Sequence, residues 1–183
     1  MDLSYLDIIP ECNADTNLVQ TLMEMKGANH QKSCGQVTNE MQTRFKDSFA
    51  IGIIDLDKKQ SSYSKESTKI ASSNEFSVCK HSNSHHYLIK IHNILENFVI
   101  SSAKEVGIDV SDLGFPLERD ELMKMTKKKE AKNNPLLTKL FKKIRSSTEM
   151  SLLSETLSYL HTNKYSVNED YIRSLFEKYG FDQ

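Results

Sequence analysis

Apolar and polar positions follow two different patterns in the first half of this 183-residue chain. Short, nearly continuous apolar runs fill 3–9 and 49–54, and the second is rich in β-branched residues, as in a strand buried on both faces. Segments 15–26 and 37–45 instead repeat apolar residues every three or four positions, which predicts helices. A strand, two helices and a buried strand in this order predict an α/β fold with a mainly parallel sheet flanked by helices.

The middle of the chain is less regular. The tract 60–74 contains seven Ser or Thr residues and no apolar period, so we expect a loop there. Residues 76–79 and 87–91 are short apolar stretches and predict two further strands. A segment rich in His, Ser and Asn separates them.

Helical spacing dominates from residue 94 onward. The first helix of this region is expected to end at Gly107, because glycine is suited to the residue after a helix. The pattern then stays helical almost to the end, where 171–179 predicts one more amphipathic helix. We therefore divide the chain into an α/β domain, 1–108, and a helical C-terminal subdomain, 109–183.

Charge and cysteine content narrow the classes of function. Lys and Arg (24) nearly balance Asp and Glu (25), so a net charge of -1 gives no overall attraction to nucleic acid or to an anionic membrane. Three widely spaced cysteines fit reduced thiols better than a zinc site or a redox pair. Without a signal peptide or a long apolar span, we expect a cytoplasmic protein that does not enter a membrane.

Three acidic residues follow predicted strands and are the best candidates for chemistry. Glu11 comes after the first strand, and Asp55 and Asp57 come after the run 49–54. Ligands bind beyond the carboxyl ends of strands in open α/β sheets, and alternate residues of an extended chain point the same way. If the two strands are neighbours, the three carboxylates would converge on a site for Mg²⁺ or Mn²⁺.

The same acidic residues also suit purely structural roles. Glu11 and Asp15 fit a helix N-terminus, where acidic groups meet the positive end of the helix dipole. Asp55, Asp57 and the two lysines after them could equally form a solvated turn. The His-rich stretch that contains His81 lacks zinc-site spacing, so we expect solvated loop side chains there, with phosphate contacts as the alternative.

Positive charge is concentrated locally, between residues 124 and 145. Such a segment is commonly a solvated helix face, but it could also follow a nucleic-acid backbone through phosphate contacts. The residues proposed for these contacts are Lys127, Lys128 and Lys129, together with Lys58 and Lys59.

Two motifs resemble the topoisomerase-primase, or Toprim, family in the compact form found in small nucleases and overcoming-lysogenisation-defect nucleases. The first is the stretch Glu11–Asp15, with Glu at a strand end and Asp four positions later. The second is Ile53–Asp57, a buried strand that ends in Asp-x-Asp. The resemblance covers roughly residues 1–108. Cys12 departs from it, because the family commonly has glycine at that position.

The resemblance implies a phosphoryl-transfer enzyme, in particular a nuclease that acts on DNA or RNA with Mg²⁺ or Mn²⁺. Glu11 would be the general acid or base, and Asp55 with Asp57 would hold the metal. Lys58 and Lys59 would lie beside the scissile phosphate, and Asp15 or Glu96 would help to hold a second metal. Such domains occur in bacterial anti-phage and mobile-element systems, beside an ATPase or another effector protein, and the oligomeric state stays open.

A second function is compatible with the same motifs. The chain could keep the Toprim-like fold without activity and serve as an interaction subunit whose C-terminal helices bind a partner protein. Cys12 and the nearly neutral net charge favour this alternative, whereas the intact Glu and Asp-x-Asp favour the nuclease. Sequence signatures of P-loop ATPases, dinucleotide oxidoreductases, serine esterases and zincins are all missing.

Overall fold

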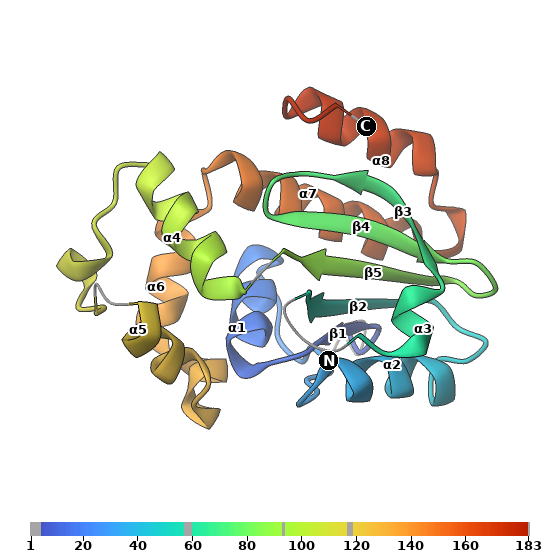
Figure 1. Cartoon of the computed structure of the whole chain (residues 1–183), viewed down its shortest axis with the longest axis horizontal. Helices are drawn as coiled ribbons and strands as arrows, with labels where there is room; N and C mark the ends of the chain where they lie inside the picture. The colour runs from blue at the N-terminus through green and yellow to red at the C-terminus, as the bar shows by residue number, and fades with distance from the viewer. Residues whose placement is uncertain (1–4, 57–59, 93, 117–118, 183) are drawn as a thin grey trace.

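The computed structural model describes residues 5–56, 60–92, 94–116 and 119–182 (Figure 1). Its centre is a five-stranded sheet in the order β1-β2-β5-β4-β3. The strands are β1 (Ile8–Pro10), β2 (Ala50–Asp55), β3 (Ser67–Ser72), β4 (Phe76–His81) and β5 (His86–Ile91). β1, β2 and β5 are parallel, whereas β4 is antiparallel to both of its neighbours. The predicted α/β class with a mostly parallel sheet is confirmed.

The predicted strands after residue 48 all form, but the prediction for 60–74 is wrong. That tract contains the short helix α3 (Ser62–Lys65) and the edge strand β3. β3 shows no apolar alternation because Thr68 and Lys69 are exposed and the register with β4 shifts between Lys69 and Ala71. Pairing with β4 makes this segment a strand, in which Ile70 and Ala71 are buried, and α8 packs beside it (Figure 1).

Helices cover the sheet and build the second half of the chain. The α-helices are α1 (Asn13–Leu22), α2 (Cys34–Thr43), α4 (Leu95–Glu105), α5 (Arg119–Thr126), α6 (Pro135–Ile144), α7 (Thr148–Asn163) and α8 (Glu169–Lys178). The 3-10 turns are η1 (Val110–Leu113), η2 (Lys129–Asn133) and η3 (Lys164–Ser166). Within the described ranges after residue 108, every regular element is helical, as predicted.

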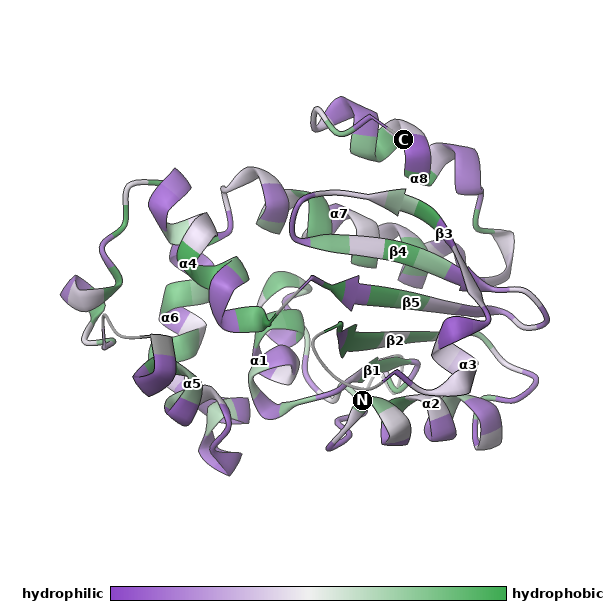
Figure 2. Cartoon of the chain, in the orientation of Figure 1, coloured by the Kyte–Doolittle hydropathy of each residue, from purple (hydrophilic) through white to green (hydrophobic). Residues whose placement is uncertain are grey.

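Alternate residues of β2 face two separate hydrophobic clusters. Ile51 and Ile53 point to the larger cluster, which contains side chains of α1, α4, α6, α7 and α8. Ala50 and Ile54 point to a smaller cluster beneath α2. Figure 2 shows β1 and β2 as apolar and α5 as largely hydrophilic. The strand is therefore buried on both faces, which explains its continuous apolar sequence.

Gly52 lets α2 approach the sheet closely. A Cβ atom at this position would lie 2.8 Å from Leu88 Cδ2 and Met41 Sδ, and 2.9 Å from Val37 Cγ1. These separations are shorter than the contacts that real Cβ atoms make, so these side chains would have to shift to admit a larger residue.

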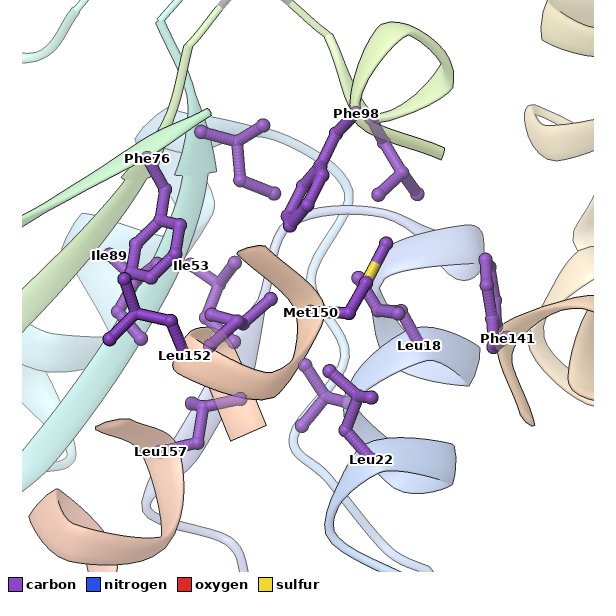
Figure 3. Close-up of a cluster of buried hydrophobic side chains, with 14 of the residues drawn as sticks. Leu18, Leu22, Ile53, Phe76, Ile89, Phe98, Phe141, Met150, Leu152 and Leu157 are labelled. Atoms are coloured by element: carbon purple, nitrogen blue, oxygen red, sulfur yellow. The ribbon is translucent and has the colours of Figure 1, made fainter. Parts of the chain in front are cut away.

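The C-terminal helices share the core of the sheet. The Phe76 ring of β4 lies 6.4 Å from that of Phe98 in α4 and 5.4 Å, edge to face, from that of Phe176 in α8. Figure 3 shows Met150, Leu152 and other side chains of α7 between the sheet and α1. The hydrophobic core thus continues across the predicted boundary at residues 108 and 109. No helix in the described part of the chain is long and apolar enough to span a bilayer.

Candidate metal and phosphate site

Glu11 follows β1 directly and lies at the carboxyl edge of the sheet. Its backbone N–H donates to the Ile53 carbonyl at 3.0 Å, which extends the pairing of β1 with β2 by one residue. Its side-chain Oε2 accepts a hydrogen bond from the Asp55 backbone N–H at 3.1 Å. Glu11 is only 1% exposed, so its carboxylate is held against the end of the neighbouring strand.

Asp55 is the last residue of β2 and lies between β1 and β5. It stands opposite Ile91 in the parallel register and is 6% exposed. Its carbonyl accepts a hydrogen bond from Gln60 Nε2 at 3.0 Å. The structure thus brings Glu11 and Asp55 together at adjacent strand ends. The other predicted residues of this segment, Asp57, Lys58 and Lys59, lie outside the described residues.

Cys12 and Asp15 form the N-terminal cap of α1. The Asp15 backbone N–H donates to Cys12 Sγ at 3.3 Å, and Asp15 Oδ2 accepts from the Cys12 backbone N–H at 3.0 Å. This reciprocal pair is a capping box in which a thiol takes the usual place of a Ser or Thr hydroxyl. Asp15 is fully buried, and one oxygen of the predicted metal ligand is engaged in starting the helix.

The Cys12 thiol is close enough to the candidate carboxylates to feel their charge. Burial raises its pKa well above the ordinary value, and the negative charges of Asp15 and then of Asp55 raise it further. The thiol is therefore protonated and neutral around pH 7. A neutral side chain therefore stands just beyond the carboxyl end of β1.

His30 lies next to this cap, with Lys132 and Lys32 near it, and the sequence did not predict this arrangement. His30 Nδ1 lies 3.1 Å from Thr16 Oγ1, and the ring also bonds to the Cys12 backbone. Burial lowers the pKa of His30, and the positive charges of Lys132 and Lys32 lower it further. Two lysines from separate parts of the chain are thus near the start of α1. Only Lys132 belonged to a basic stretch in the sequence, and His30 carried no signal.

Glu96 adds a further carboxylate to the same edge of the sheet. It lies in the first turn of α4, which follows β5, and β5 runs parallel to β2. The residue is 6% exposed, and its Oε1 accepts a hydrogen bond from Thr126 Oγ1 of α5. The sequence offered Glu96 as an alternative ligand for a second metal, and the structure ties it to α5.

The basic segment suggested for phosphate contacts is exposed. Lys127 and Lys128 follow α5, and Lys129 begins η2. All three residues are accessible to solvent, and η2 also contains Lys132.

The expectation that the clustered histidines are solvated is wrong for two of them. His81 ends β4 and His86 begins β5, and they are 4% and 1% exposed. Both lie near the amino end of β5, whereas Asp55 lies at the carboxyl edge. Their distance along the strands separates them from the candidate site.

Hydrogen bonds explain why His86 is buried. Its Nε2 lies 2.9 Å from the Phe45 carbonyl and 3.1 Å from that of Ser48, so this nitrogen carries the proton. Its Nδ1 then accepts from the Tyr63 hydroxyl, whose ring stacks on His81 with centroids 3.9 Å apart. Burial, the largest cause, lowers the pKa of His86 below 6.5, although the two carbonyls act in the opposite direction.

We expect His86 to make the fold less stable in acid. Between the lowered pKa of the folded state and 6.5, the unfolded chain binds more protons, so stability is lost as the pH falls. The contribution to the slope of unfolding free energy is at most about 1.4 kcal/mol per pH unit. His86→Gln keeps one donor and one acceptor. Between pH 7.5 and 5, its free energy of unfolding in urea should depend less on pH than that of the natural chain. His85→Gln, at an exposed ring, is the matched control and should keep the natural slope; equal slopes in all three proteins would contradict the prediction.

The donors at the carboxyl edge suit a hard divalent cation. Glu11 and Asp55 provide carboxylate oxygens at neighbouring strand ends, and Mg²⁺ and Mn²⁺ prefer such ligands. Within 5–56, 60–92, 94–116 and 119–182, no group of three or more His, Cys, Asp or Glu side chains is arranged to hold an ion. The third predicted ligand, Asp57, is outside these ranges, so Glu11 and Asp55 are the described members of the set.

Comparisons with known proteins find no match for this chain, whether among protein-family models, curated proteins or solved structures.

Proposed function

We propose that this chain is a divalent-metal-dependent phosphoryl-transfer enzyme, a nuclease that acts on DNA or RNA. The observation that carries the proposal is the hydrogen bond from the Asp55 backbone N–H to Glu11 Oε2 at 3.1 Å. It joins two buried acidic residues from parallel neighbouring strands, at the edge where open α/β sheets bind ligands. Strand, Glu, helix and a second strand ending in Asp also occur in the order that the Toprim resemblance implies.

The proposed roles follow from the positions of the carboxylates. Asp55, together with Asp57, would hold Mg²⁺ or Mn²⁺, which stabilises negative charge on a transferring phosphoryl group. Glu11 would accept or donate the proton of the nucleophile or leaving group, because its carboxylate is oriented by the Asp55 N–H. Asp15 would support the site from the start of α1, where it also caps the helix.

Lysines are proposed to contact the nucleic acid. Lys58 and Lys59 directly follow the acidic motif in the sequence and would lie next to the scissile phosphate. Lys127, Lys128 and Lys129 are exposed and would bind the backbone farther away. Contacts of this kind are independent of base sequence and weaken as salt is added.

A second candidate function is favoured by one observation, the Cys12 thiol. This neutral side chain stands where a bare glycine backbone would let a phosphate approach, and the negative charges of Asp15 and Asp55 raise the pKa of its thiol further than burial alone. Under this alternative the chain is a Toprim-like interaction subunit without activity. It would bind a partner such as an ATPase or another effector protein.

Metal binding should be visible as thermal stabilisation. Because a ligand that binds only the folded state stabilises it, Mn²⁺ at about 100 times its Kd should add about 2.7 kcal/mol, or roughly 5–11 °C in Tm. Asp55→Asn should abolish this shift. Asp47→Asn makes the same chemical change at an exposed residue before β2 and should leave the shift intact. An equal shift in all three proteins, measured by circular dichroism in EDTA and in Mn²⁺, would show that the ion binds elsewhere.

A further inference from the structure

A large open groove runs between α1 and α6. Its volume is about 1320 Å³, and it is lined by α1, the turn after that helix, η2 and α6. We propose that this groove binds the sugar–phosphate backbone of a nucleic-acid strand and guides it toward Glu11 and Asp55. This inference rests on the proposed function and names the surface through which the substrate is held.

The charges along the groove are mostly positive. Lys26, Lys132, Lys142 and Arg145 line it, against a single lining acid, Glu24. Arg145 pairs with Glu24 at 2.5 Å and, with Lys142, lowers the pKa of this carboxyl. Among the described residues, none forms an ion pair with Lys26, Lys132 or Lys142. Three ammonium groups thus remain to meet phosphate oxygens.

A fully bonded asparagine fixes the width of the groove. Asn17 Nδ2 donates to the carbonyls of Ala131 and Asn134 at 2.9 and 3.1 Å. Its Oδ1 accepts from the hydroxyls of Thr21 and Thr138 at 3.2 and 3.0 Å. Three of these bonds tie α1 to η2 and to the start of α6, and the fourth, from Thr21, lies within α1. A binding surface that is already rigid loses less entropy when a ligand binds.

The positive charges lead to the candidate site. Arg145 and Lys142 lie beside the C-terminal end of α1, where Arg145 also donates to the Leu22 carbonyl at 3.1 Å. Toward the N-terminal end of α1, the positive charge of Lys132 lowers the pKa of His30. His30 bonds to the backbone of Cys12, the residue after Glu11. The ten residues of α1 span about 15 Å, roughly the axial length of four phosphates of one strand.

The shape and lining of the groove favour a nucleic-acid strand over other ligands. Small-molecule pockets usually measure about 300–1,000 Å³ and are mostly apolar, whereas this groove is larger, and Met25 is the single large apolar side chain among its described lining residues. Protein interfaces usually centre on aromatic anchors, which the lining does not contain within the described chain. Cationic side chains beside neutral polar groups instead match contacts to a phosphate backbone.

Two triple variants with the same net charge test the groove. Lys26, Lys132 and Lys142 are changed to Gln in one, and the exposed Lys46, Lys65 and Lys69, outside the groove, are changed to Gln in the other. Anisotropy titrations of a labelled 20-nucleotide single strand, in EDTA and at several salt concentrations, measure binding without cleavage. The groove variant should bind at least about tenfold more weakly, and its salt slope should fall by about 2, because each phosphate contact contributes about 0.7. The control variant should keep the affinity and slope of the natural chain.

Four results would contradict the proposal that the groove binds a nucleic-acid strand. The first three are no binding by the natural chain, unchanged binding by the groove variant, and equal loss of affinity in both variants. The fourth is displacement of the labelled strand by polyglutamate as readily as by the unlabelled strand, which would indicate an acidic-peptide site. Failure of the proposed enzyme is distinguishable from failure of the groove. If binding depends on the groove but no metal-dependent cleavage occurs, the groove proposal stands and the enzyme proposal fails. If the groove variant cleaves and binds with unchanged affinity, the groove proposal fails and the enzyme proposal stands. Unchanged circular dichroism of both variants shows that they are folded.

Discussion

Asp55→Asn should abolish divalent-metal-dependent cleavage of nucleic acid by this chain. The substitution removes a negative charge at the end of β2 and keeps the shape of the side chain and the backbone N–H that bonds to Glu11. Glu11→Gln should lower the rate by about 10²–10⁴-fold, the usual contribution of a general acid or base. Loss of Asp55, the proposed metal ligand, should cost at least as much. Single-turnover cleavage of labelled single- and double-stranded DNA and RNA in Mn²⁺ and Mg²⁺ measures both effects.

Asp47→Asn is the matched control for the first prediction, because Asp47 is an exposed acid in the turn before β2. It should cleave at the natural rate. Equal rates in the natural chain and Asp55→Asn would identify a contaminating nuclease and reject the proposed site. If the natural chain neither cleaves any substrate nor gains stability from metal, the interaction subunit becomes the better explanation. Cys12 would then be the residue whose side chain closes the site.

Phe176→Ala should destabilise the whole chain by about 3–5 kcal/mol, the usual cost of truncating a buried Phe. Phe176 is fully buried in α8, and its ring packs edge to face against Phe76 of the sheet. For a chain of this size, the loss corresponds to roughly 6–20 °C in Tm. Because the C-terminal helices and the sheet share one core, far-UV circular dichroism and tyrosine fluorescence should report a single, coincident transition.

Tyr171→Ala provides the comparison on the same helix. Tyr171 is 50% exposed and stacks on Tyr159, so its loss should cost only about 0.5–1.5 kcal/mol. Two separate transitions in the natural chain, or a melting temperature for Phe176→Ala close to that for Tyr171→Ala, would contradict a shared core. Such a result would favour a helical subdomain that folds by itself.

The sequence by itself determined the strands that carry the acidic residues. A parallel strand covered on both faces must be apolar throughout, so 49–54 could be recognised as β2, and the abrupt change to Asp55 marked its carboxyl end. Glu11 was expected after a strand at 3–9, but among the described residues only Ile8–Pro10 form β1, and 5–7 are a turn. The proximity of Glu11 and Asp55 followed from the expectation that the two strands are neighbours, which the parallel pairing of β1 with β2 bears out.

Only the tertiary structure decided which polar residues are buried and which charged residues line the same surface. β3 depends on pairing with β4, and His86 on carbonyls from the turn before β2, so neither had a periodic signal. Lys26 from the turn after α1 and Lys142 of α6 line the same groove, although more than a hundred positions separate them in the sequence. Apolar periodicity reports which face of an element is buried. Contacts between polar groups instead depend on how whole elements pack, and no local pattern in the sequence records that packing.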